Sequence, residues 1–169
     1  RNKMEFSFGK KEGNIILGLK KRGLFDQIIQ TNHCQLESEE ISKMLIFIEK
    51  ELTKLNLSVW DYHKHEGLLR HLIIRHSKHY NKFMFIFVIS KTCSKLPPFY
   101  ETLKQQFPHV ISLFERQNSS HGDTTLSDNT NLIWGDPFLK EKLGNYNFFI
   151  SPDSFFQTNS KGAEVLYET

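Results

Sequence analysis

The stretch LLRHLIIRHSKHYNKFMFIFVIS, residues 68–90, decides the fold of this chain. Its two apolar segments, 68–75 and 83–90, are separated by the polar turn 79–82 (HYNK). The seven apolar residues 83–89 are too few to cross a membrane, and a run of this length is typical of a buried strand. The stretch therefore predicts two consecutive strands joined by a turn.

Similar patterns on both sides of this pair predict further strands and two or three helices. Ser38 is placed to cap a helix over 38–56, and Pro97 and Pro98 suit the first turn of a second helix that ends at Phe107. Because hairpins are mixed with few helices, we expect an α+β fold with a largely antiparallel sheet. The other predicted strands are 4–8, 14–19, 24–30, 110–114, 132–134, 139–143 and 147–150; 118–131 is predicted to be a loop and 161–167 a helix-like run.

Length and composition indicate one ordinary globular domain, because 169 residues with 38% hydrophobic content can bury a proper core. Two cysteines, Cys34 and Cys93, are too few for a disulfide framework, so we expect a reducing, cytoplasmic setting. We also expect a monomer without membrane contact. The chain starts directly before a strand pattern and ends inside a helical one, so we expect it to be a fragment of a longer protein.

Basic residues are concentrated at the start of the chain, although the net charge is only +3. A local excess of this kind can follow a phosphate backbone, which makes RNA a candidate partner. The alternative is a solvated hairpin whose charges keep it in solution. The basic residues are Arg1, Lys3, Lys10, Lys11, Lys20, Lys21 and Arg22, against Glu5 and Glu12.

Two arginines interrupt the first of the two predicted central strands. Strict alternation along a strand places Arg70 on the same face as Leu72 and Ile74. Arg75 lies on the opposite face with Ile73. A buried guanidinium needs a partner, so we expect at least one of the two arginines to face a groove or another domain. The alternative is an edge strand with Arg70 at its rim.

Five of the eight histidines are close together in the sequence. A zinc site needs three or four converging ligands, whereas strand alternation sends His71 and His76 to opposite faces, so a zinc or iron protein is the weakest hypothesis. The sequence contains no Gly-rich phosphate loop and no local signature of Ser-His-Asp or Cys-His catalysis. The five histidines are His63, His65, His71, His76 and His79.

The stretch SPDSFFQTN, residues 151–159, is where the sequence offers a ligand site. It follows an apolar run and precedes the helix-like run, so it connects a strand to a helix, where α/β proteins often place ligands. Its adjacent Phe155 and Phe156 can stack on a flat base, while the Gln157 amide offers both a donor and an acceptor.

Several motifs in a fixed order extend this interpretation. They are RNKMEFSFG (1–9), LGLKKRG (17–23), Cys34, LRHLIIR (69–75) and ISPDSFFQTN (150–159), of which the last is the most specific. In these motifs the chain resembles the RNA uracil-5 methyltransferases of the TrmA/RumA type, which use S-adenosylmethionine to methylate carbon 5 of a uridine in tRNA or ribosomal RNA. The resemblance covers essentially the whole chain. It implies the family's central domain, residues 1–150, followed by the start of its catalytic domain, residues 151–169.

The resemblance also implies roles for individual residues. Gln157 would contact S-adenosylmethionine, and Phe155, or Phe156 beside it, would hold the target base after it flips out of its stack. Asn159 is expected to cap the following helix and shape the site. Cys34 matches the fourth ligand of a 4Fe-4S cluster that some members hold, although the three upstream cysteines are not in this sequence.

The family's Gly-rich cofactor loop, catalytic Cys and general-base Glu would lie after residue 169, so no catalytic residue is expected here. The alternative function is a stand-alone RNA-binding module without enzymatic activity, which would hold single-stranded RNA by stacking. The expected RNA contacts, besides the aromatic motif and Asn159, are Arg1, Lys3, Lys20, Lys21, Arg22 and Arg70.

Overall fold

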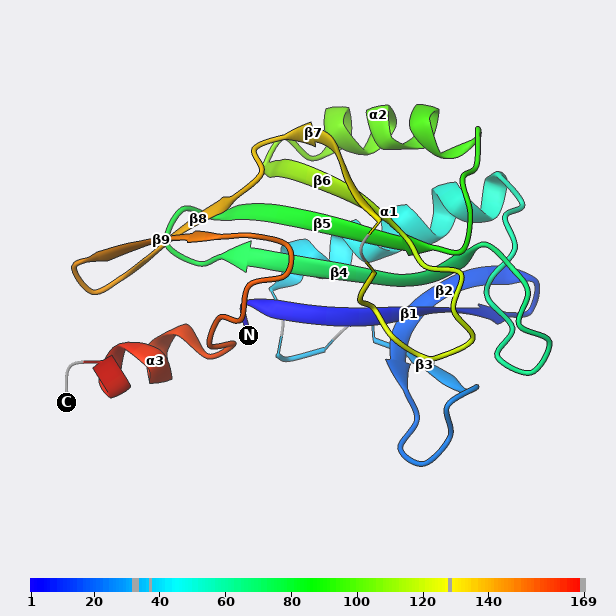
Figure 1. The fold of residues 1–169 in the computed structure, drawn as a ribbon, viewed down its shortest axis with the longest axis horizontal. Helices are drawn as coiled ribbons and strands as arrows, with labels where there is room; N and C mark the ends of the chain where they lie inside the picture. Colours follow the sequence, from blue (N-terminus) through cyan, green and yellow to red (C-terminus); the bar gives the residue numbers. More distant parts are fainter. Residues whose placement is uncertain (32–33, 37, 128, 168–169) are drawn as a thin grey trace.

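The computed structural model describes residues 1–31, 34–36, 38–127 and 129–167 (Figure 1). Within these residues, seven strands form one sheet in the order β3-β2-β1-β4-β5-β6-β7, and β8 and β9 form a separate hairpin. The strands are β1 (Lys3–Lys11), β2 (Asn14–Lys20), β3 (Ile28–Gln30), β4 (Leu69–Ser77), β5 (Lys82–Ile89), β6 (Val110–Gln117), β7 (Thr130–Gly135), β8 (Leu139–Leu143) and β9 (Tyr146–Ile150).

The predicted pair of central strands is β4 and β5, which pair antiparallel and lie in the middle of the sheet. All nine residues of β4 are buried. Neighbouring strands are antiparallel except β5 and β6, which run parallel because α2 connects them as a crossover. The α+β fold with a largely antiparallel sheet is therefore confirmed.

Helices cover one face of the sheet. These are α1 (Glu39–Lys54) and α2 (Leu96–Gln106), while α3 (Ser160–Tyr167) lies apart near the C-terminal end (Figure 1). Pro97 and Pro98 occupy the first turn of α2 as predicted. Ser38 precedes α1, but its side chain makes no capping bond, and its backbone oxygen accepts from the Ile41 and Ser42 amides instead.

Alternate residues of β5 enter two different cores. Phe85 and Phe87 point toward α1 and α2 in the helix-side core. Met84 and Ile86 point to the opposite face, where the loop-side core also contains Ile150. In the part of the chain that the structure describes, no helix combines the length and apolar character that a membrane crossing requires.

The hairpin of β8 and β9 is attached to the turn between β4 and β5 through one buried carboxylate. Glu141 accepts hydrogen bonds from the Ser77 hydroxyl (3.2 Å) and from the backbone amides of Lys78 (2.7 Å) and His79 (3.1 Å). Because β9 leads directly into residues 151–159, this anchor also determines where that segment begins.

Two expectations about the strands are wrong. The strand predicted over 24–30 is limited to β3, because residues 21–27 form a turn in which the Lys21 amide donates to the Gln27 carbonyl. The edge-strand alternative for Arg70 fails because β4 lies between β1 and β5. A bulge between Leu69 and His71 breaks the alternation, so Arg70 contacts the same loop as His71 instead of sharing a face with Leu72 and Ile74.

The packing of α1 predicts a difference between two isoleucines on opposite faces of this helix. Ile48 is 0% exposed and Ile46 is 46% exposed. We expect Ile48→Ala to lower the free energy of unfolding by about 2–5 kcal/mol, because it leaves a cavity in the helix-side core. Ile46→Ala is the control and should change it by about 0.5 kcal/mol. Urea unfolding followed by circular dichroism measures both, and equal losses would contradict this orientation of α1.

Candidate functional site

Residues 151–159 connect β9 to α3 and run over the face of the sheet opposite the helices. Figure 1 shows this segment, in orange, turning in front of β4 and passing close to the start of β1. It contains neither helix nor strand, so its backbone depends on bonds to other parts of the chain. Two buried residues, Asn2 and Arg75, bond to this backbone, and a third, Arg116, pairs with the Asp153 side chain.

Arg75 reaches the segment from β4. Its Nη2 donates to the carbonyl oxygens of Pro152 (3.0 Å) and Ser154 (2.6 Å). Burial lowers the pKa of Arg75 below its ordinary value, and the nearby carboxylates of Asp153 and Glu5 act in the opposite direction. The guanidinium therefore exchanges water for two backbone acceptors, which fixes the turn at 152–154.

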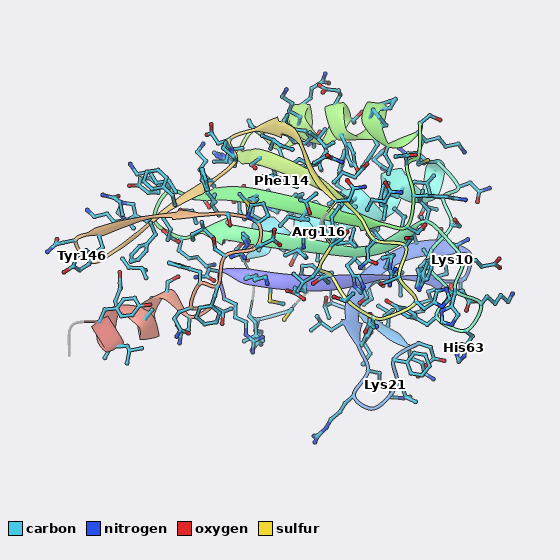
Figure 2. The ribbon with its side chains drawn as sticks, viewed as in Figure 1. Lys10, Lys21, His63, Phe114, Arg116 and Tyr146 are labelled. Carbon is cyan, nitrogen blue, oxygen red and sulfur yellow. The ribbon has the colours of Figure 1, made fainter. Side chains whose placement is uncertain are left out.

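Arg116 holds the same turn from β6. Its Nη2 forms an ion pair with the Asp153 carboxylate, its Nη1 donates to the Thr125 carbonyl (2.7 Å), and its Nε donates to the Thr130 hydroxyl (2.8 Å). One buried side chain thus connects the segment to the loop between β6 and β7 and to β7 itself. Figure 2 shows Arg116 over the middle of the sheet.

Asn2 holds the other end of the segment. Its Nδ2 donates to the Gln157 carbonyl (2.8 Å) and to the Ser160 hydroxyl (2.9 Å), and its backbone amide donates to the Thr158 carbonyl (2.8 Å). The Asn2 carbonyl in turn accepts from the His76 amide of β4 (2.8 Å). The first and the last sequence motifs are therefore joined directly in space.

These bonds present the motif side chains in different ways. Phe155 is 86% exposed, whereas Phe156 packs against Phe148 with ring centroids 5.4 Å apart. Gln157 is half-buried. Asn159 accepts from the Gly162 amide through Oδ1 (3.2 Å), so its predicted capping of α3 is confirmed. The result is a free aromatic face two residues from a partly sheltered amide, on a backbone held by the sheet.

The predicted basic residues form two groups. Lys20, Lys21 and Arg22 lie at the end of β2 and in the following turn, and Figure 2 shows Lys21 pointing away from the sheet. Arg1 and Lys3 are at the other end of the sheet, beside Asn2. The Arg1 ammonium donates to the Leu36 carbonyl (2.7 Å), and Lys3 pairs with Glu5 (2.6 Å).

Arg70 is not presented to a ligand, because it is fully buried. Its guanidinium stacks on the Trp60 ring (4.3 Å to the centroid) and donates to the carbonyls of Asn118, Ser120 and Gly122. Burial lowers the pKa of Arg70 from its ordinary value. Arg70 therefore holds the loop between β6 and β7 and offers no donor at the surface.

Comparison with known proteins shows which proteins the chain is similar to. No family model matches the chain. An uncharacterized RNA methyltransferase of Oceanobacillus iheyensis is 32% identical over 99% of this chain and 37% of the relative, and one of Caldanaerobacter subterraneus is 31% identical over 100% and 38%. The chain is homologous to a region of the RNA methyltransferases. The resemblance inferred from the motifs is thereby confirmed, and the chain spans somewhat more than a third of the length of these relatives.

A solved structure shares the fold. The tRNA (uracil-54, C5)-methyltransferase of Pyrococcus abyssi, in complex with S-adenosyl-L-homocysteine, superposes with a TM-score of 0.79 at 24% identity. The match covers 99% of this chain and 39% of that enzyme. The chain therefore shares the arrangement of strands and helices of the corresponding part of that enzyme.

In the part of the chain that the structure describes, the cysteines and histidines do not gather in groups that could hold a metal. His71 contacts Ser7 on one face of the sheet and His76 stacks on Phe83 on the other, as predicted. Cys34 is half-buried against the helix-side core. Among residues 1–31, 34–36, 38–127 and 129–167, no three His, Cys, Asp or Glu side chains group to hold a metal ion. A 4Fe-4S cluster needs four thiolates, so the residues present do not fit one.

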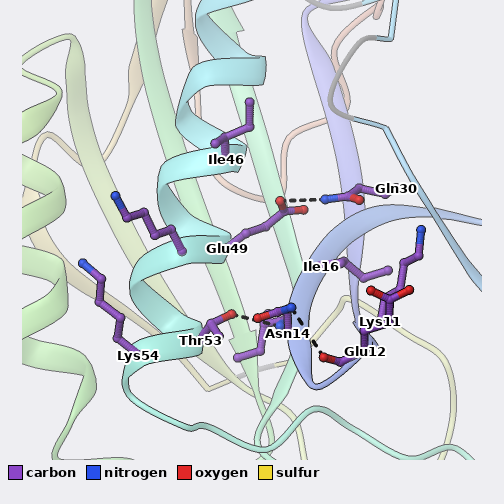
Figure 3. A pocket seen from close by; sticks show the side chains of 11 residues that line it. Lys11, Glu12, Asn14, Ile16, Gln30, Ile46, Glu49, Thr53 and Lys54 are labelled. Atoms are coloured by element: carbon purple, nitrogen blue, oxygen red, sulfur yellow. Dashed lines mark hydrogen bonds between the residues drawn. The ribbon is translucent and has the colours of Figure 1, made fainter.

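A pocket of about 550 Å³ lies on the helix side between α1 and β2 (Figure 3). Figure 3 shows Glu49 pointing from α1 toward Gln30, and its carboxylate accepts from Gln30 (2.8 Å) and from the Leu17 amide (2.6 Å). Thr53 accepts from the Ile15 amide (2.9 Å). These groups satisfy the open edge of β2, so we assign the pocket no ligand.

Sequence reasoning missed Asn2 and Arg116 as supports of the site, and Glu49 as a support of β2. The signal for Arg116 in the sequence was an arginine close behind the apolar run of β6. The partners of Asn2 and Glu49 are far away along the chain, at separations of 155 and 32 residues, and no local pattern indicates them.

The anchoring role of Arg116 predicts a large loss of stability on its removal. Arg116→Met deletes the bonds to Asp153, Thr125 and Thr130 and leaves these three acceptors without the arginine, so we expect the free energy of unfolding to fall by about 2 kcal/mol or more. Arg22→Met makes the same substitution at an exposed position and should cost about 0.5 kcal/mol. Chemical denaturation measures both variants. Similar costs would show that Arg116 does not hold the segment.

Proposed function

We propose that this chain is the RNA-contacting part of an S-adenosylmethionine-dependent enzyme that makes 5-methyluridine in ribosomal RNA or tRNA. The observation that carries the proposal is the segment 151–159. Its backbone is held by Arg75 and Asn2, and it exposes Phe155 beside the half-buried Gln157. The uracil-C5 specificity of the Pyrococcus abyssi enzyme, together with its bound S-adenosyl-L-homocysteine, supports the same assignment. In this proposal residues 1–150 are a central domain and residue 151 begins the catalytic domain.

The exposed aromatic ring suits the handling of a base. Carbon 5 of a stacked uridine is hard to reach, so an enzyme that methylates it gains from turning the base out of its stack. The face of Phe155 offers a replacement stacking surface for that base. Gln157 would offer its amide to S-adenosylmethionine, which supplies the methyl group when bound. Phe156, packed against the loop-side core, anchors the backbone next to Phe155.

The two basic groups provide contacts for the phosphate backbone. Lys20, Lys21 and Arg22 lie at one end of the sheet face, and Arg1 and Lys3 lie beside the segment at the other. Each phosphate that a lysine or arginine neutralises releases counterions, so affinity would fall steeply with salt. We also propose that the protein is a monomer in the cytoplasm, consistent with its two free cysteines.

No residue of this chain is assigned as the catalytic nucleophile or base, since neither Cys34 nor Cys93 lies at the proposed site. We expect the complete protein, produced from its full reading frame, to transfer labelled methyl groups from S-adenosylmethionine to carbon 5 of uridine in RNA. Gln157→Ala in that protein should raise the KM for S-adenosylmethionine. The isolated 169 residues should bind RNA without methyl transfer. RNA binding by a complete protein that is inactive would favour the stand-alone binding module instead.

The aromatic residues predict a separation between RNA binding and stability. Phe155→Ala should weaken binding of a short oligouridylate by about tenfold, because stacking is worth about 1–3 kcal/mol per base, and should leave unfolding unchanged. Phe156→Ala should lower the free energy of unfolding by about 3 kcal/mol. Phe149→Ala removes another exposed ring, 66% accessible on β9, and is the control for nonspecific stacking. Fluorescence anisotropy measures the affinity, and an equal loss for Phe149→Ala and Phe155→Ala would contradict the assignment.

A further inference from the structure

A second polar cluster lies at the end of the sheet that carries the basic turn. Lys20 of β2 forms an ion pair with Asp123, which belongs to the loop between β6 and β7. His71 of β4 places its Nε2 3.4 Å from the other oxygen of the same carboxylate. The Tyr62 hydroxyl is 3.5 Å from that Nε2. Figure 1 shows the loop, in yellow, passing in front of β4 and β1.

The donors of this cluster are supported from behind by the rest of the fold. The Tyr62 ring lies 4.0 Å below the Lys20 ammonium. His71 is buried, and its Nδ1 is 3.3 Å from the Ser7 hydroxyl of β1. The cluster brings together side chains from three different parts of the chain: Lys20, Tyr62 and His71. None of the three is an anion that could balance the charge of the lysine.

The acceptor is supplied by Asp123, whose side chain is 41% exposed. Hydrogen bonds from His71 and Lys20 lower the pKa of Asp123 well below its ordinary value, so it is an anion at neutral pH. The carboxylate thus places two anionic oxygens at a solvent-facing position among donors. The same arrangement suits the two nonbridging oxygens of a phosphate diester.

The loop does not depend on this carboxylate for its conformation. Arg70 binds three of its carbonyls, and the Asn118 amide donates to the carbonyls of Thr124 (2.9 Å) and Leu126 (3.0 Å). The Asp123 side chain can therefore rotate into solvent while the loop backbone stays in place. Such a rotation exposes Lys20 directly beside Lys21 and Arg22, which are already accessible.

We propose that Lys20, His71 and Tyr62 form a binding site for one phosphate of an RNA backbone, and that the Asp123 carboxylate fills this site until RNA displaces it. The inference rests on the proposed RNA-binding function and adds a defined phosphate site to it. Asp123 then lowers the affinity of this site for small anions. An RNA strand that binds along the whole basic turn makes additional contacts, and these contacts compensate for displacing the carboxylate.

The test compares two substitutions that remove one negative charge near the basic turn. Asp123→Asn removes the competing anion, whereas Asp26→Asn removes a carboxylate of similar exposure, 40%, that pairs with His63 and does not touch Lys20. We expect Asp123→Asn to bind a short oligouridylate about tenfold more tightly than the unchanged chain, which corresponds to about 1.4 kcal/mol. Asp26→Asn should change the affinity by less than about threefold.

Two further measurements separate a phosphate site from a general charge effect. In Asp123→Asn, the slope of log affinity against log salt concentration should become steeper by about one, because Lys20 then binds a phosphate without first losing its partner Asp123. Adding Lys20→Met to Asp123→Asn should abolish the gain. Inorganic phosphate should shift the His71 ring signals in the NMR spectrum of Asp123→Asn more than in the unchanged chain.

The outcomes distinguish this inference from the function on which it rests. If the unchanged chain binds RNA but Asp123→Asn gains no more than Asp26→Asn, the phosphate site is refuted and the RNA-binding function stands. Weaker binding by Asp123→Asn, with normal thermal unfolding, would also refute it. If neither the unchanged chain nor any variant binds RNA, the proposed function itself fails.

Discussion

Buried guanidinium groups determine how the irregular parts of this protein run. Arg70, Arg75 and Arg116 are almost completely inaccessible, and a buried charge is tolerated only where it gains hydrogen bonds or an ion pair. Their partners are mostly backbone carbonyls of the loop between β6 and β7 and of residues 152–154. Neither segment has regular structure, so the arginines supply the donors that a neighbouring strand would supply in a sheet.

This arrangement places the candidate site on a rigid base. β4 and β6 are strands of the main sheet, and their side chains reach the segment without intervening flexible elements. A site supported by buried side chains that are bonded to it keeps its geometry better than one on a free loop. The backbone around Phe155 is held in place. Its ring is therefore exposed to solvent and still has a defined position.

Elements with strong local patterns could be predicted from the sequence. The helical spacing from Ile41 to Leu52 identified α1, and the apolar run after Lys82 identified β5. The extent of β3 was overestimated, because a backbone bond between Lys21 and Gln27 closes a turn that composition does not reveal.

The site could be predicted only in part. The order of the motifs indicated Gln157 and Phe155 as site residues. It did not show that the motif at the start of the chain belongs to the same site, which follows from the contacts of Asn2 with Gln157 and Ser160. The position of Arg70 was misjudged since alternation assumes a regular strand, and the bulge beside Leu69 is a tertiary feature. Long-range bonds of this kind depend on the completed fold.

The position of β1 has a consequence for synthesis of the chain. β1 pairs with β2 across a short turn, whereas its other neighbour, β4, begins only at Leu69. On the ribosome, the first hairpin is therefore complete while one edge of β1 still lacks a partner, and such an edge invites pairing with other nascent chains. Lys10 and Lys11 lie at the end of that strand. Lysines on a strand with an unpaired edge discourage such pairing, so these two residues protect the hairpin from aggregation during translation.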